Sequence, residues 1–153
     1  IIELSRNFIK KNKIYNENDN DIFLKEMGGY ITFISSIIVK KKLWLDIPNH
    51  EYSKSWFSHL AKILIIKKNS KALYLSKILV NMRVFSQTWS ADHFEIWNIF
   101  YPKILWSLSG YTDKSKSAIV KKNPLNSLTR IFSSCAYNNY DSKIYFKFIR
   151  NYF

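Results

Sequence analysis

The chain has 153 residues, of which 47% are hydrophobic and 17% aromatic, enough for a single domain with a sizeable core. Its net charge of +13, from 24 Lys and Arg against 11 Asp and Glu, indicates a polyanionic partner, with the lysine bias of an AT-rich genome as the alternative explanation. The single cysteine excludes an intrachain disulfide, and no uncharged run approaches the roughly 20 apolar residues of a membrane span. With only 3 Gly and 3 Pro for turns, a β-sandwich or barrel is disfavoured and a mainly helical fold is expected.

Residues 1–46 are expected to be an N-terminal extension whose fold the sequence leaves open. The acidic and basic groups of residues 1–27 cancel, and Gly28 and Gly29 form a break. The β-branched run at 30–39 fits either a strand or a short helix. The triple lysine at 40–42 is either a solvated turn or a phosphate contact.

Residues 47–82 are predicted to be a helix, a basic turn and a second helix, the start of a helical core over 47–153. Ser53 can cap the first helix. Its apolar stripe is Trp56, Phe57, Leu60, Ala61, Ile63 and Leu64. Asn69 can take a left-handed conformation in the turn. The second helix is expected to be central, because it shows one apolar face of Leu75, Leu79 and Met82 and another of Leu73, Val80 and Val84.

Three further segments follow. Ser90 can cap a helix that Pro102 ends or kinks, with Phe94, Trp97 and Tyr101 on one side. Residues 103–120 are expected to be a loop or short β-hairpin. Asn123 and Pro124 predict a helix start, followed by Leu125, Leu128, Phe132 and Cys135. Asp141 can cap a last helix that bears Tyr145, Phe148, Ile149 and Tyr152. The predicted fold class is all-α: a compact helical bundle with a shortened loop or hairpin between the third and fourth core helices.

No catalytic constellation is found in the sequence. Its histidines (His50, His59, His93) and its cysteine have no zinc-site spacing, and no Gly-rich phosphate loop is present. The run from Asp92 to Glu95 is interpreted as helix surface, since adjacent helical residues point in different directions. We therefore expect no enzyme activity, metal, cofactor or small-molecule substrate.

The binding signal lies in the lysines. No acidic residue occurs between Glu51 and Asp92, and basic residues gather at the predicted turn, at the start of the helix after Asn123 and along the last helix. Several such groups are typical of a protein that grips folded RNA at more than one point. The predicted RNA-binding residues are Lys54, Lys67, Lys68, Lys71, Lys121, Lys122, Arg130, Lys143, Lys147 and Arg150.

The order of these segments resembles the small-subunit ribosomal protein seven family over roughly residues 47–153. The matching stretches are Ile47-Pro48-Asn49-His50-Glu51-Tyr52, the helix to Leu64-Ile65, Leu75-Ser76-Lys77-Ile78-Leu79, Phe94 to Pro102, Lys121-Lys122 leading to Thr129-Arg130-Ile131-Phe132, and Cys135-Ala136. The chain departs from the family at Asn69, where Gly is usual, and at a hairpin reduced to Ser109-Gly110-Tyr111. The family's C-terminal helix and aromatic tail are absent.

The resemblance implies a structural ribosomal protein that binds the 3′ major domain of small-subunit rRNA and organises the head beside neighbouring ribosomal proteins. The shortened hairpin puts contact with exit-site tRNA in doubt. The Ile1 start and five Trp in an AT-biased chain suggest an organelle-encoded, mitochondrial protein. The alternatives are a helical nucleic-acid-binding subunit of another ribonucleoprotein or defence complex, and a peripheral membrane accessory subunit, although a membrane partner is not expected.

Overall fold

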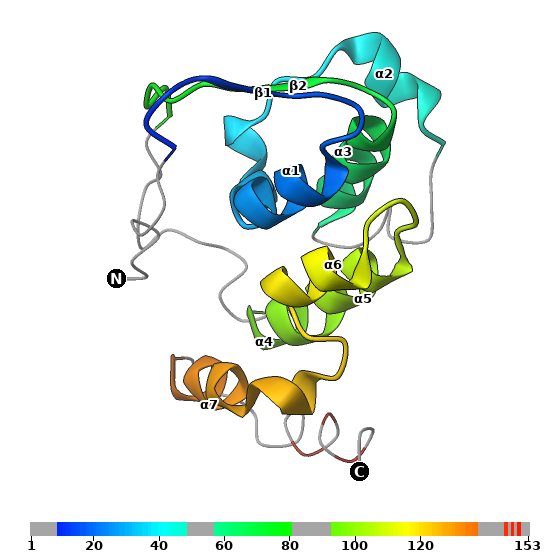
Figure 1. Cartoon of the computed structure of the whole chain (residues 1–153). Coiled ribbons are helices and arrows are strands. Elements are labelled where there is room, and N and C mark those ends of the chain that lie inside the picture. The colour runs from blue at the N-terminus through cyan, green and yellow to red at the C-terminus, as the bar shows by residue number, and fades with distance from the viewer. Residues whose placement is uncertain are drawn as a thin grey trace.

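The computed structural model describes residues 9–48, 57–80 and 93–137, together with residues 146, 148 and 150 (Figure 1). Its described helices are α1 Asn20–Met27, α2 Lys41–Asp46, α3 Ser58–Lys68, α4 His93–Glu95, α5 Tyr101–Ser107, α6 Asp113–Ile119 and α7 Leu128–Tyr137. Short 3₁₀ turns occupy Tyr30–Thr32, Ile34–Ser36 and Pro124–Ser127, and Ile96–Phe100 is π-helical. The strands are β1 Lys13–Tyr15 and β2 Ala72–Tyr74. The expected mainly helical fold is confirmed, with a small antiparallel sheet added.

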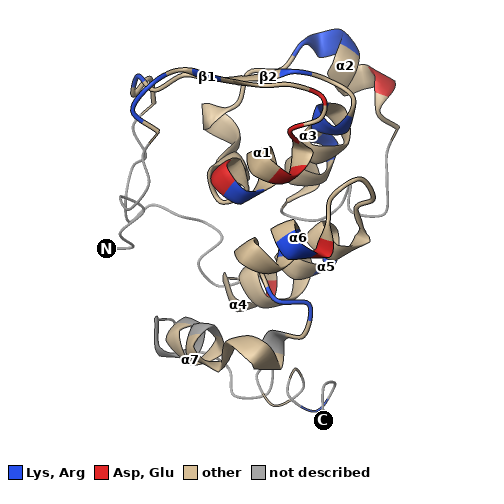
Figure 2. Cartoon of the chain, in the orientation of Figure 1, with Lys and Arg blue, Asp and Glu red and all other residues tan. Residues whose placement is uncertain are grey.

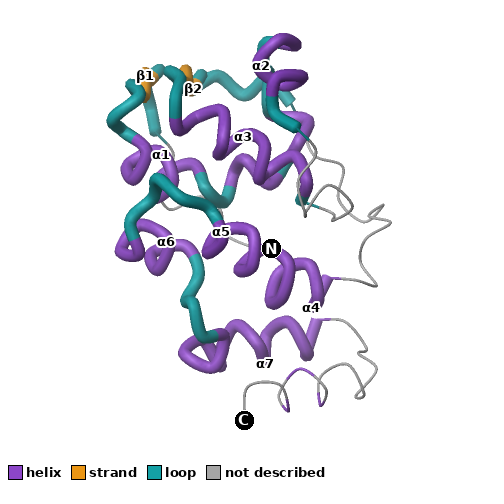
Figure 3. Tube along the Cα trace, turned by 90° about the vertical axis from the view of Figure 1, so that its right-hand side faces the viewer, coloured by secondary structure: helices purple, strands orange, loops and turns teal. Residues whose placement is uncertain are grey.

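The elements are stacked from one end of the molecule to the other. Figures 1 and 3 both place β1, β2 and α2 at one end, α1 and α3 beneath them, α5 and α6 next, and α4 and α7 at the opposite end. The largest buried side chains come from every layer, although α2 and β2 contribute none. They include Tyr15, Leu24, Leu60, Leu64, Phe94, Ile104, Leu105 and Ile131. The first 46 residues, whose fold the sequence left open, thus supply Tyr15 and Leu24 to the same core as α3 and α5.

The β1–β2 ribbon replaces the second helix predicted after the basic turn. Its register pairs Lys13 with Tyr74, Ile14 with Leu73 and Tyr15 with Ala72. Tyr15 is fully buried against Phe23, with ring centroids 5.2 Å apart, whereas Leu73 is 60% exposed. The helix prediction was wrong here because pairing with a distant strand outweighs local helical spacing.

The prediction of two buried faces on this segment was also wrong. Leu75, Leu79 and Val80 are exposed rather than central. Met82 and Val84 lie outside the described residues.

Helix α3 carries the predicted apolar stripe from Phe57 to Leu64 in the core, although the expected cap, Ser53, and Trp56 lie outside the described residues. Asn69, the residue that follows α3, has φ −120° and ψ 19° and does not take the left-handed conformation that the sequence allowed for it. The hydroxyl of Tyr111 donates to the carbonyl of Leu64 (2.7 Å), which ties the loop before α6 to this helix.

The helix that begins at α4 continues past Pro102. Of Phe94, Trp97 and Tyr101, predicted to lie on one side of the helix, Phe94 and Tyr101 are buried and Trp97 is partly buried. Pro102 itself is buried within α5. Proline lacks an N–H, and its ring crowds the preceding turn of a helix. The helix accommodates Pro102 through the wider π turn at Ile96–Phe100 and does not end there. The predicted cap, Ser90, lies outside the described residues.

Residues 103–120 are not the expected loop or hairpin. They contain the end of α5 and the whole of α6, and the described part of this segment holds no strand. The Thr112 hydroxyl caps α6 by accepting from the Ser115 N–H (3.3 Å), a local signal that the sequence interpretation missed.

The helix start at Asn123 and Pro124 is confirmed. The Asn123 side chain accepts from the Leu125 N–H (2.9 Å), and a 3₁₀ turn leads into α7. Ile131 of α7 is buried, whereas Leu128 and Phe132, predicted to follow Leu125 at heptad spacing, are exposed. The side chain of Cys135, the cap Asp141 and most of the predicted last helix lie outside the described residues.

Candidate nucleic-acid interface

Lys67, the first lysine of the predicted RNA-binding turn, lies in the interior. It is 2% exposed, and its ammonium group donates to the Asn16 carbonyl (2.8 Å) and to the Asn20 side-chain oxygen (3.0 Å). Burial lowers its pKa, against the opposing charges of Asp19 and Glu17. Lys67 joins α3 to the loop before α1 and is therefore unavailable to phosphate.

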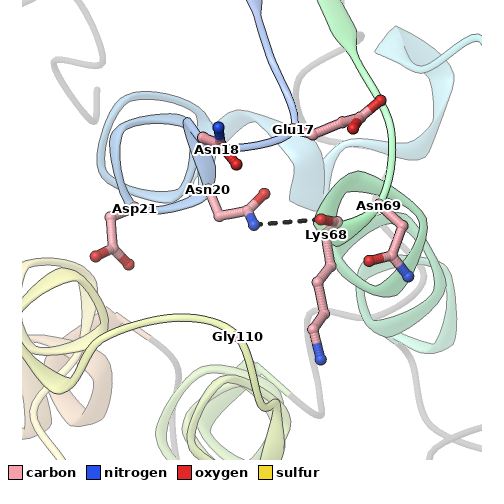
Figure 4. A pocket seen from close by; sticks show the side chains of 7 residues that line it. All are labelled: Glu17, Asn18, Asn20, Asp21, Lys68, Asn69 and Gly110. Carbon is pink, nitrogen blue, oxygen red and sulfur yellow. Dashed lines mark hydrogen bonds between the residues drawn. The ribbon is translucent and has the colours of Figure 1, made fainter.

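Lys68 and Lys71 differ in their environment: Lys68 is partly buried, and Lys71 is exposed. Figure 4 shows the Lys68 side chain beside Gly110 in an open polar hollow of about 480 Å³. Its ammonium group donates to the Ser109 hydroxyl (3.2 Å), and the Asn20 amide donates to its backbone carbonyl (3.3 Å). Lys71 is exposed just before β2. The turn therefore offers one fully free lysine, Lys71, rather than a cluster of three.

The second predicted group lies beside a tryptophan. Lys121 and Lys122 are exposed after α6, and Lys122 Nζ lies 5.5 Å from the Trp106 ring centroid. Lys116 Nζ lies 5.7 Å from the same centroid, and the indole N–H donates to the Val120 carbonyl (3.2 Å). This arrangement orients Lys122 and leaves Lys121 open to solvent.

The remaining predicted residues are placed only in part. Arg150 is exposed. Lys54, Lys143 and Lys147 lie outside the described residues, as does the side chain of Arg130, whose backbone belongs to α7. Of the third predicted group, only Arg150 is therefore described.

The ribbon instead assembles a basic site that sequence reasoning missed. The Asn12 side-chain oxygen accepts hydrogen bonds from the Ser76 N–H (3.0 Å) and hydroxyl (3.1 Å), across 64 residues of chain. This link brings Lys11 and Lys77, the residues beside it, to one end of the ribbon, and Lys10 is also exposed there. We call Lys10, Lys11 and Lys77 the ribbon-end lysines. Only the strand pairing could reveal them, since nothing local joins residue 11 to residue 77.

Most of the described acidic residues lie in or next to α1, as Figure 2 shows. Glu26 accepts from Lys13 Nζ (2.6 and 2.9 Å) and from the Tyr15 hydroxyl (2.6 Å). Burial acts to raise the pKa of Glu26, but these hydrogen bonds outweigh it and lower the pKa. No described acidic side chain forms an ion pair with a ribbon-end lysine, so the positive charge of this end has no acidic counterpart in the part of the chain that the structure describes.

Other kinds of site are not seen in the described part of the chain. Residues 9–48, 57–80 and 93–137 contain no group of three His, Cys, Asp or Glu side chains arranged to hold a metal ion. Within these residues, no helix has both the length and the apolarity that crossing a membrane requires.

Comparison with known proteins adds no relative: no family model, no curated protein and no solved structure matches the chain.

Proposed function

We propose that the chain is a structural RNA-binding protein that contacts phosphates through the ribbon-end lysines. The observation that carries the proposal is that the Asn12–Ser76 hydrogen bonds bring the segments holding Lys11 and Lys77 to one end of the ribbon, where neither lysine has an acidic partner among the described residues. Exposed ammonium groups can neutralise phosphates without being buried, and the release of counterions from the RNA drives association. Lys71, Lys121 and Lys122 are further contacts on separate surfaces.

The specific particle proposed is the small subunit of a mitochondrial ribosome, with the chain at the 3′ major domain of its rRNA. This part of the proposal rests on the resemblance to the small-subunit ribosomal protein seven family. Residues 75–79, matched to a helix of that family, are not helical, and no hairpin occurs at residues 103–120. The proposal therefore keeps the resemblance of α3 and of the segment from Lys121 to Ala136. The chain is proposed to hold converging RNA helices and neighbouring head proteins together, without catalysis.

A salt titration of RNA affinity tests the phosphate contacts. Each neutralised phosphate adds about 0.7–0.9 to the slope of log affinity against log salt. The double variant Lys11→Ala/Lys77→Ala should therefore lower the slope by about 1.4–1.8. The matched control Lys25→Ala/Lys114→Ala removes two exposed lysines from α1 and α6 and should change it by less than about half a unit. Equal losses in both variants would show that net charge alone, rather than this site, binds RNA.

Sedimentation of the tagged chain tests the particle. We expect it to migrate with the small ribosomal subunit and its rRNA. If the chain instead migrates in a smaller ribonucleoprotein that lacks small-subunit rRNA, the proposal of RNA binding stands and the proposal of a ribosomal protein is refuted.

A further inference from the structure

The segment from residue 34 to residue 45 turns aliphatic side chains towards solvent. Ile38 is 93% exposed, Leu45 65% and Ile34 56%, and Leu43 is also exposed. No residue of α2 is buried. Aliphatic groups gathered in this way on a chain that fills its core with leucines indicate a contact surface.

Trp44 sets the orientation of α2 against the rest of the molecule. Its half-buried indole packs against the core, and Lys62 of α3 places its ammonium group 5.1 Å from the ring centroid. With Trp44 turned towards α3, its neighbours Leu43 and Leu45 lie about 100° to either side of it around the helix, and both are exposed. Both Figure 1 and Figure 3 show α2 at the outer edge of the ribbon end.

Three lysines accompany the aliphatic residues. Lys40, Lys41 and Lys42 are exposed, and Asp46 is the acidic residue of the segment, so residues 34–46 carry +3 − 1 = +2. No described acidic side chain forms an ion pair with these lysines. Positive charge and aliphatic surface therefore occur together within about ten residues.

The combination favours an anionic lipid surface over the other candidate partners. RNA would use the lysines but gain little from Ile38 and Leu45. Protein interfaces are poor in lysine and use aromatic anchors, whereas the aromatic residue here faces the core. A bilayer uses both parts, because lysines meet anionic headgroups while apolar side chains enter the boundary with the acyl chains.

We propose that residues 34–45 dock onto an anionic lipid bilayer. Ile38, Leu43 and Leu45 enter the interface, and Lys40 to Lys42 lie among the headgroup phosphates. This surface does not include the ribbon-end lysines, so the proposal stands or falls independently of RNA binding.

Vesicle flotation of the full, nuclease-treated chain tests the proposal. We expect binding to phosphatidylcholine vesicles that contain phosphatidylserine and none to phosphatidylcholine alone. Ile38→Ser/Leu45→Ser should lower vesicle binding at least about tenfold and leave RNA affinity unchanged. Lys40→Ala/Lys41→Ala/Lys42→Ala should lower it on the order of 100-fold. The control, Leu128→Ser/Phe132→Ser, alters two apolar residues of α7 that are also exposed, by 50% and 56%, and should float like the unchanged chain.

Several results would overturn the proposal. One is the absence of flotation with phosphatidylserine vesicles. Another is normal flotation of Ile38→Ser/Leu45→Ser, which would reduce the interaction to charge alone. A third is a dimer of the unchanged chain that this variant dissolves without altering flotation, since the surface would then join two copies. Thermal unfolding of each variant controls for folding, and Ile34→Ser/Leu43→Ser provides a second, independent pair.

Discussion

Asp21 is expected to be the main polar link between α1 and α6. Its carboxylate accepts hydrogen bonds from the Thr112 N–H (2.8 Å), the Thr112 hydroxyl (2.7 Å) and the Ser115 hydroxyl (2.7 Å). A hydrogen bond to a charged group contributes about 1.5–3 kcal/mol where water cannot replace it. Thr112 is exposed and can turn to water, so Asp21→Ala should cost about 2–4 kcal/mol in total rather than the full sum.

Thermal and urea unfolding measure this loss. For a chain of this length we expect the melting temperature of Asp21→Ala to fall by roughly 5–15 °C. Asp113→Ala is the matched control, because it removes an exposed carboxylate from the first turn of α6 and should cost under about 1 kcal/mol. An Asp21→Ala variant within about 0.5 kcal/mol of the unchanged chain would refute the reasoning.

The same carboxylate makes the link sensitive to acid. Burial acts to raise the pKa of Asp21, but the hydrogen bonds from Thr112 and Ser115 outweigh it and hold the pKa below its ordinary value. A carboxyl group whose folded pKa is lowered stabilises the fold above its unfolded pKa, about 4, and loses that contribution as the pH falls. The unfolding free energies of the unchanged chain and of Asp21→Ala should therefore converge below about pH 4.

Two further predictions concern buried polar side chains. Lys67→Met should cost about 1–3 kcal/mol, because two acceptors lose their donor, and leave the salt slope of RNA binding unchanged. Lys71→Met should do the reverse, and a Lys67 variant with full stability but weaker RNA binding would contradict the interior placement. Burial lowers the pKa of His59 despite its hydrogen bond with the Thr32 carbonyl (3.0 Å). Since the unfolded state then binds the proton first, stability should fall below about pH 6.5, by at most about 1.4 kcal/mol per pH unit. His59→Gln should flatten the pH dependence of the unfolding free energy. An unchanged pH dependence in this variant would show that His59 is not its source.

Local signals accounted for the parts of the fold that the sequence predicted correctly. The cap at Asn123, the break at Gly28 and the apolar stripe of α3 each depend on residues within a few positions of one another. The same local reading produced the error at β2, where Leu73, assigned to a helix by its spacing, instead pairs with Ile14 of β1. The spacing of apolar residues within a segment does not show whether that segment pairs with a strand elsewhere in the chain.

The binding surfaces show the same division. A lysine in a basic run is expected to be solvated, and for Lys71, Lys121 and Lys122 that holds. Lys67 differs because its ammonium group donates hydrogen bonds to Asn16 and Asn20, which lie 51 and 47 residues away in the sequence. Nothing in the turn distinguishes it from its neighbours.

The sequence by itself determined the helical class, the excess of positive charge and the helix start before α7, since composition and neighbouring residues suffice for these. Tertiary structure alone decided which lysines stay exposed and which segments meet. The reason is that each deciding contact spans much of the chain: Asn12 with Ser76 across 64 residues, and Asp21 with Thr112 across 91. Such contacts form only when the core closes, and the ribbon-end lysines and the outward face of α2 are consequences of that closure.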